Sequence, residues 1–178
     1  MMQKVLIFRG APASGKSTIV PEIAKLLTKP VVLIEEDKFR WGFHIIGRSV
    51  SEVGSDEHRF AYENTRMLYE RYLEVGMYSI VLEGLFTWNN KSSPEGSAKE
   101  LVDLAEQHGF EAISIVLTAE KEELRRRNTM REYTVPAKEF EELYNGVHQE
   151  LNSSEIIIDT TNESTEETIA RLKLLLSL

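Results

Sequence analysis

The sequence predicts a doubly wound α/β fold, in which helices cover both faces of a parallel β-sheet. Short and nearly continuous apolar runs, rich in β-branched residues, alternate with longer segments of helical periodicity. Continuous apolar runs are typical of strands that are buried on both faces of a parallel sheet. We expect five such strands, at residues 4–9, 31–35, 79–83, 111–117 and 155–159. Strand–helix alternation along the whole chain favours right-handed crossovers between them.

Helix start and stop signals lie between these strands. Ser97 with Glu100, and Ser164 with Glu167, have the spacing of a capping box, which predicts a helix after each serine. Further helices are expected over about residues 58–75 and after residue 136, where apolar residues recur at helical spacing. Residues 42–56 show weak periodicity and include Gly47 and Gly54, so we expect a loop there, on the acceptor side of the site described below.

Length and composition favour one globular domain spanning residues 1–178. The chain has no cysteine, which excludes disulfides, thiolate metal sites and a cysteine nucleophile. Its four histidines lack metal-ligand spacing and are expected to be polar surface or helix residues. No apolar run approaches the roughly 18–20 residues that span a bilayer, and the first residues lack the features of a signal peptide. We therefore expect a cytoplasmic protein without membrane contact.

The charge is distributed unevenly along the chain. The formal net charge is −8, and all of it falls in the second half, because residues 1–89 are balanced. The densest basic tract nevertheless lies in that acidic half, at residues 121–131. A cationic cluster in an anionic chain indicates either a small anion site or a solvated helix face with charge pairs such as Glu122 with Arg126.

The first expected strand leads into a motif of the form G-x-x-x-x-G-K-[ST], which predicts a phosphate-binding loop. The motif consists of Gly10, Ala11, Pro12, Ala13, Ser14, Gly15, Lys16, Ser17 and Thr18. Backbone without a Cβ at both glycines can curl closely around phosphate oxygens, and the following helix directs its positive end at the anion. Lys16 would add a positive charge at the β- and γ-phosphates of ATP, and the Ser17 hydroxyl could ligate Mg²⁺.

Two charged motifs follow later strands. Asp37-Lys38-Phe39-Arg40 follows the second strand, at the edge of the sheet where ligands bind in such folds. Asp37 could accept a proton from a hydroxyl in line with the γ-phosphate, or could be a helix-cap or turn residue beside solvated Glu35 and Glu36. After the fourth strand, the tract around Arg127 and Arg131 offers planar guanidinium groups that suit phosphate oxygens.

Glu83 ends the third expected strand, in a segment similar to a Walker B strand that usually ends in Asp. Its carboxylate could orient a Mg²⁺-bound water, or it could cap the next turn. The loop that follows, residues 86–94, contains no arginine, whereas many nucleotide kinases place a substrate-binding arginine near this point.

Three of these motifs, at residues 10–18, 37–40 and 124–131, together resemble those of the small P-loop kinases, an AAA-type group. The resemblance is closest to the branch of polynucleotide kinases, zeta toxins and chloramphenicol phosphotransferases. The resemblance implies a P-loop NTPase sheet with strand order 2-3-1-4-5 and an arginine-bearing lid over about residues 121–136. It also implies that Asp37 is the general base, that Arg40 positions the acceptor, and that Arg127 and Arg131 clamp the phosphates.

We therefore expect an ATP- and Mg²⁺-dependent phosphotransferase that acts on a hydroxyl group. A small polar acceptor is favoured over a nucleic-acid 5′-hydroxyl end, because the net charge of −8 would repel a long polyanion. Two alternatives remain open: a nucleotide kinase with a phosphate acceptor, and an ATP-binding regulatory module without an acceptor. The sequence identifies neither the acceptor nor the oligomeric state.

Overall fold

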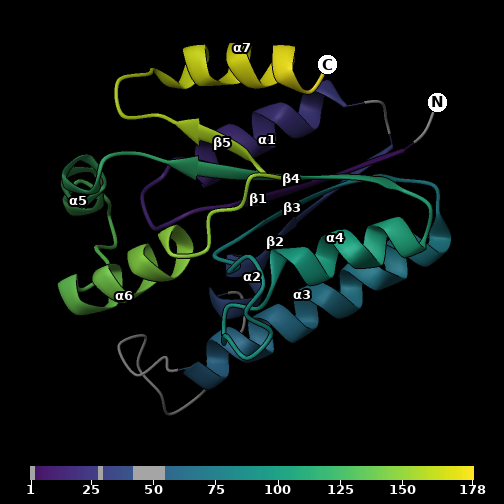
Figure 1. Ribbon diagram of the computed structural model, residues 1–178, viewed down its shortest axis with the longest axis horizontal. Helices are drawn as coiled ribbons and strands as arrows, with labels where there is room; N and C mark the ends of the chain where they lie inside the picture. The colour runs from purple at the N-terminus through teal and green to yellow at the C-terminus, as the bar shows by residue number, and fades with distance from the viewer. Residues whose placement is uncertain (1–2, 28–29, 42–54) are drawn as a thin grey trace.

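Five parallel strands form one sheet with the order β2-β3-β1-β4-β5 (Figure 1). They are β1 (Lys4–Arg9), β2 (Val31–Glu35), β3 (Ser79–Gly84), β4 (Glu111–Thr118) and β5 (Ile156–Asp159). The computed structural model describes residues 3–27, 30–41 and 55–178, so most of the loop expected over residues 42–56 lies outside the described residues. The predicted doubly wound fold and its strand order are confirmed, and each strand lies within one residue of its expected bounds.

Seven helices are described: α1 (Lys16–Leu26), α2 (Glu36–Trp41), α3 (Ser55–Val75), α4 (Ala98–Gln107), α5 (Lys121–Thr129), α6 (Ala137–His148) and α7 (Thr165–Leu175). Ser164 and Glu167 form the complete capping box at the start of α7. Ser97 caps α4 through a 3.2 Å bond from the Glu100 N–H, but the Glu100 carboxylate instead accepts a bond from the Tyr62 hydroxyl. The predicted capping box at Ser97 is therefore only half formed, because the Glu100 side chain bonds to the distant Tyr62 instead of the Ser97 backbone.

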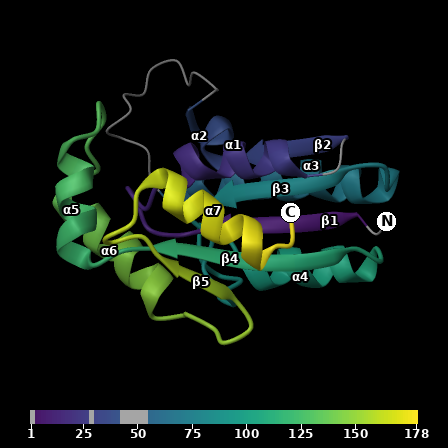
Figure 2. The same ribbon diagram turned by 90° about the horizontal axis from the view of Figure 1, so that it is seen from above.

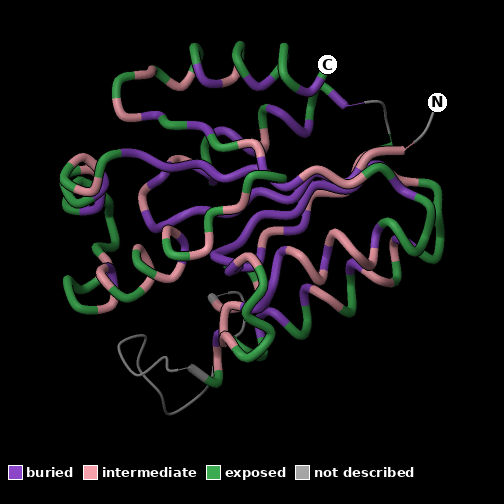
Figure 3. The backbone as a smooth tube through the Cα atoms, viewed as in Figure 1, coloured by how far each residue is buried: buried purple, intermediate pink, exposed green. Residues whose placement is uncertain are grey.

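The helices cover the sheet on both faces, with α1 and α7 on one side and α3 and α4 on the other (Figure 1). Side chains alternate along β1 accordingly: Val5 and Ile7 pack in the cluster with α3 and α4, whereas Leu6 and Phe8 pack with α1 and α7. The central strands are buried along their length (Figure 3). This two-sided burial explains why the strands have continuous apolar sequences.

Helices α5 and α6 lie beyond the carboxyl ends of the strands rather than over a face (Figure 2). They have a small apolar cluster of their own, in which Leu124 and Phe140 pack with Ala11 and Ala119. Ala11 belongs to the predicted phosphate loop, so the two helices are packed directly against that loop. No helix within the described part of the chain is long and apolar enough to cross a membrane.

A buried ion pair joins the end of β1 to the segment before β5. The Arg9 guanidinium donates to both Glu155 carboxylate oxygens, at 2.7 and 2.6 Å, and neither side chain is exposed. Arg9 also donates to the backbone carbonyls of Phe86, Val147 and Glu150. Because each charge is paired and further hydrogen-bonded, the pair can be accommodated inside the protein.

We predict that Arg9→Met lowers the free energy of unfolding by about 3–5 kcal/mol, because it leaves the Glu155 carboxylate buried without its cation. Urea denaturation measures this loss. Arg71→Met is the matched control, since Arg71 pairs with Glu74 on an exposed helix surface and should change stability by less than about 1 kcal/mol. A loss no larger than that of the control would contradict the importance of the buried pair.

Candidate active site

The predicted phosphate loop connects β1 to α1 and makes a tight turn that requires both of its glycines. A Cβ at Gly10 would lie 2.2 Å from the Leu117 carbonyl oxygen on the neighbouring strand β4. Gly15, immediately before α1, has φ +93°, a left-handed conformation that residues with a Cβ rarely adopt. Close strand packing and a left-handed turn thus shape the loop into a concave backbone surface at the start of α1.

Lys16 is curled over this loop. Its ammonium donates to the Gly10 carbonyl at 2.8 Å and to the Ala11 carbonyl at 3.2 Å. Burial lowers the pKa of this ammonium, while the nearby Glu83 carboxylate opposes the shift. The loop therefore holds a buried cation at the point where the motif predicts β- and γ-phosphates.

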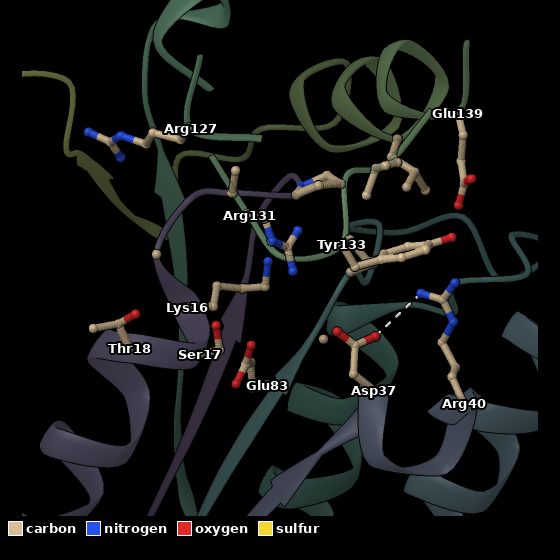
Figure 4. Close-up of a pocket in the computed structure, with 17 residues that line it drawn as sticks. Lys16, Ser17, Thr18, Asp37, Arg40, Glu83, Arg127, Arg131, Tyr133 and Glu139 are labelled. Atoms are coloured by element: carbon tan, nitrogen blue, oxygen red, sulfur yellow. Dashed lines mark hydrogen bonds and ion pairs between the residues drawn. The ribbon is translucent and has the colours of Figure 1, made fainter. Parts of the chain in front are cut away.

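The parallel sheet brings three further carboxyl groups to the same edge. Glu83 is paired in register with Phe8 of β1 and with Glu35 of β2, so it lies between the ends of these strands. Glu36 and Asp37 directly follow β2 in the first turn of α2. Figure 4 shows Glu83, Ser17 and Lys16 close together, with Asp37 on the other side of the same cavity.

Glu83 is suited to a cation site. It is buried, and its Oε2 atom has no hydrogen-bond partner among the described residues. Burial raises the pKa of this carboxyl to about 7, although Lys16 opposes the shift. The described residues contain no group of three or more potential metal-ligating side chains. Ser17 and Glu83 fit Mg²⁺ nevertheless, because Mg²⁺ keeps several waters and takes few protein ligands.

Glu36 differs from the expectation of a solvated carboxylate. It is 1 % exposed, accepts a 3.0 Å bond from the Leu85 N–H, and leaves Oε1 without a partner among the described residues. Burial raises the pKa of the Glu36 carboxyl to about 8, so the group is largely protonated at neutral pH. The expectation of a solvated Glu36 was wrong. The sequence gives no sign that the first turn of α2 places this side chain against the backbone just after β3, where it accepts from Leu85.

Asp37 and Arg40 lie on one side of α2 and contact each other. The Arg40 guanidinium donates to Asp37 Oδ1 at 3.3 Å and lies 3.0 Å from His58 Nε2. The Asp37 side chain is 58 % exposed, while that of Arg40 is only 6 % exposed. His58 was expected to be a polar surface or helix residue; it lies in α3 and is buried, with its Nε2 next to the Arg40 guanidinium.

Two arginines of the basic tract, Arg125 and Arg126, form ion pairs with glutamates of α5 and α6. Arg125 pairs with Glu122 and Glu141, and Arg126 pairs with Glu123. Both arginines match the interpretation as a charge-paired helix face, but the partners differ from the expected pair of Glu122 with Arg126. Glu122 pairs with Arg125 and Glu123 with Arg126, each at i,i+3 spacing.

The two expected clamp residues are placed differently from each other. Arg127 pairs with Glu123 and donates to the Thr160 hydroxyl at 2.9 Å and to the Thr160 carbonyl at 2.7 Å. The Arg131 side chain forms no hydrogen bond or ion pair with any described residue, and its guanidinium points towards Lys16 (Figure 4). Of the two expected clamp residues, Arg131 is therefore the one whose guanidinium faces the phosphate loop.

A cavity of about 240 Å³ brings most of these groups together. Its lining includes every predicted catalytic residue and both predicted metal-binding residues: Lys16, Ser17, Asp37, Arg40, Glu83, Arg127 and Arg131. Tyr133 and Glu139 line it as well and were not predicted (Figure 4). No motif in the sequence marks Glu139, and Tyr133 lies two residues after Arg131, within the expected lid segment, without matching a motif of its own.

A second hollow lies on the other side of the phosphate loop. It is bounded by Gly15 and Thr18 of the loop, by Arg126 and Arg127 of α5, and by residues 160–165 between β5 and α7. Arg127 lines both hollows, so it stands between them.

Comparison with known proteins is consistent with this geometry. A family model described as an AAA domain matches residues 5–151, and the chain belongs to this family. Similar solved structures include shikimate kinase from Bacteroides thetaiotaomicron, with 18 % identity, a TM-score of 0.59 and complete coverage of both chains. Thymidylate kinase from Candida albicans has 13 % identity and a TM-score of 0.63, with 99 % of this chain and 92 % of that chain covered.

A protein of Chloroflexus aurantiacus, provisionally assigned as a kinase, has 21 % identity and a TM-score of 0.65, with 99 % and 97 % coverage. These likenesses show that the fold is that of P-loop kinases. The narrower resemblance to polynucleotide kinases, zeta toxins and chloramphenicol phosphotransferases stays a prediction.

We predict that Mg²⁺ binding by the ATP complex weakens as pH falls from 8 to 6, because protonation of Glu83 near pH 7 removes the negative charge that attracts the cation. Calorimetric titration of the ATP complex with Mg²⁺ at several pH values measures this change. Glu83→Gln should bind Mg²⁺ at least tenfold more weakly at pH 8 and should lose most of the pH dependence. An unchanged pH profile in that variant would contradict the assignment.

Proposed function

We propose that this protein transfers the γ-phosphate of ATP, with Mg²⁺, to a hydroxyl group of a small polar acceptor. The observation that carries the proposal is the shared cavity in which the Lys16 ammonium, the Arg131 guanidinium and the Asp37 carboxylate meet. A phosphoryl-transfer enzyme needs positioned cations around the moving phosphate and a base beside the attacking oxygen. The kinases named above act, by their names, on small molecules, which agrees with this choice.

The nucleotide would lie across the phosphate loop. Its phosphates would accept hydrogen bonds from the backbone N–H groups at the start of α1, while its base and ribose would occupy the hollow between α5 and residues 160–165. Arg127, held at Thr160, stands between the two hollows and would contact the phosphates from the side opposite Arg131. We assign residues 121–136 to a lid within one unit of residues 1–178, because this segment carries both arginines.

In the proposed reaction, the acceptor hydroxyl oxygen forms a bond to the γ-phosphorus while the bond from phosphorus to the bridging oxygen of ADP breaks. Asp37 takes the hydroxyl proton, and Lys16 and Arg131 stabilise the charge on the transferred group. Ser17 and Glu83 would hold Mg²⁺, which neutralises part of the phosphate charge when it is bound. Arg40 is largely buried and bonded to Asp37, so we assign it to orienting that carboxylate at the acceptor side.

A screen with labelled ATP tests the proposal as a whole. Hydroxylated small molecules, nucleoside monophosphates and 5′-hydroxyl oligonucleotides should be compared, alongside calorimetry of ATP binding. Transfer only to a phosphate group would favour the nucleotide kinase, and tight ATP binding without any transfer would favour a regulatory module. Absence of ATP binding would overturn the proposal.

We predict that Asp37→Asn lowers kcat by about 10²–10⁴-fold, because the amide cannot accept the hydroxyl proton. The affinity for ATP should change little, since Asp37 lies on the acceptor side of the cavity. Steady-state kinetics with the acceptor found in the screen measure kcat, and Asp103→Asn on α4 is the matched control. Activity of the Asp37 variant near that of the control would remove Asp37 as the base.

We predict that Arg131→Met lowers kcat by at least about 10²-fold, because it removes an unpaired cation that faces the transferred phosphate. Arg126→Met should change kcat less than twofold, since Arg126 is exposed and paired within α5. Arg127→Met should mainly raise the KM for ATP, because Arg127 is bonded to Thr160 at the nucleotide side. Rapid-quench and steady-state kinetics distinguish these effects, and equal kcat values in the Arg131 and Arg126 variants would contradict the proposed clamp.

A further inference from the structure

A larger cavity, of about 490 Å³, lies beside the cavity that contains Asp37. Leu85, Glu139 and Leu143 line both cavities, so the two are adjacent across a shared wall. The larger one is enclosed by α6, by the start of α3, and by the loop between β3 and α4. Its volume suits a small ligand of about the size of a sugar, and its position is on the acceptor side.

The lining of this cavity is strongly acidic. Among the described residues, its lining contains the carboxylates of Glu95, Glu139, Glu142 and Glu150, and no lysine or arginine. Glu139 has no hydrogen-bond or ion-pair partner among the described residues, and Glu142 has only the exposed Lys138, 3.9 Å away. Four carboxylates with so little cationic compensation make the cavity unfavourable for an anion and favourable for a cation.

Two of these four carboxylates accept hydrogen bonds from neutral donors. Glu150 Oε2 accepts the Asn89 N–H at 3.1 Å, and Glu95 accepts the Ser93 hydroxyl. Neutral donors fix the side chains and leave their negative charge in the cavity. Glu95 and Glu150 are therefore oriented by hydrogen bonds, while the Glu139 and Glu142 side chains accept no hydrogen bond from any described residue.

His58 provides an independent sign of a ligand in the same cavity. It lines the cavity, is only 7 % exposed, and its Nε2 lies 3.0 Å from the Arg40 guanidinium, which can only donate. Nε2 must therefore accept, so the proton of the neutral ring is on Nδ1, which has no partner among the described residues. A buried donor without a partner is costly, and a hydroxyl or ether oxygen of a ligand would satisfy it.

We infer that the phosphoryl acceptor is a hydroxyl compound that carries at least one ammonium group, such as an amino sugar or a related amino alcohol. Its ammonium binds among the carboxylates of the larger cavity, an oxygen accepts from His58, and a hydroxyl extends past Leu85 towards Asp37. This inference rests on the proposed function and specifies its substrate class. Sugar phosphates, nucleotides and nucleic-acid ends are disfavoured because the same carboxylates repel them.

The test measures binding and transfer with a set of sugars of matched ring size. Glucosamine is cationic, glucose and N-acetylglucosamine are neutral, and glucuronate and glucose 6-phosphate are anionic. Calorimetry with the protein saturated by Mg²⁺ and a non-hydrolysable ATP analogue gives the affinities, and labelled ATP gives kcat/KM. We expect glucosamine to bind at least tenfold more tightly than either neutral sugar, and the anionic sugars to bind more weakly still.

Charge-removing variants connect this preference to the cavity. Glu142→Gln combined with Glu150→Gln should reduce the preference for glucosamine to less than twofold. Glu106→Gln, an exposed carboxylate near the end of α4, should preserve it, and the affinity for the ATP analogue should be unchanged in both variants. Loss of the preference in the control as well would overturn the inference, as would its retention in the double variant.

The failure of the inference and the failure of the proposed function are distinguishable. Tighter binding of neutral or anionic sugars, or no detectable binding of glucosamine, overturns the inference. Phosphoryl transfer to one of those neutral or anionic sugars would at the same time support the proposed function. Selective binding of glucosamine with no phosphoryl transfer to any hydroxyl compound would support the cationic site and overturn the kinase.

Discussion

The pairing of Arg9 with Glu155 fixes the relation between the parts that form the site. Arg9 immediately precedes the phosphate loop, and its guanidinium is bonded to the carboxylate before β5 and to carbonyls of the loop after β3 and of the end of α6. Those same segments form walls of the larger acidic cavity. A charge inside the protein must be fully compensated, so these segments have little freedom to move relative to β1. One buried cation thus connects the phosphate loop to the proposed acceptor site.

The electrostatics of the site depend on which groups are buried. Lys16 and Arg131 are close enough for Arg131 to lower the pKa of the Lys16 ammonium, so both favour an anion between them. Burial instead raises the pKa values of the Glu36 and Glu83 carboxyls, which reduces the negative charge beneath that anion at neutral pH. The larger cavity has the opposite character, because the described residues that line it include four carboxylates and no lysine or arginine. The two adjacent cavities therefore favour ligands of opposite charge.

Much of the fold and the phosphate loop could be predicted from sequence because the signals are local. A strand buried on both faces must be apolar throughout, and the glycines of the loop are required where a Cβ would strike Leu117 or where φ is positive. The capping box at Ser164 is also local and is formed as expected. The box at Ser97 is only half formed, because Tyr62, 38 residues from Glu100, takes the glutamate carboxylate.

The sequence by itself determined the order of strands and helices, the phosphate loop, and the charged motifs that follow β2 and β4. Only the tertiary structure decided which arginine faces the loop, since both Arg127 and Arg131 were expected to clamp the phosphates but Arg127 is hydrogen-bonded to Thr160. It also decided that Glu36 and His58 are buried and that four glutamates from two distant segments line one cavity. The physical reason is that burial and charge compensation depend on neighbours far apart in the chain, which no local pattern records.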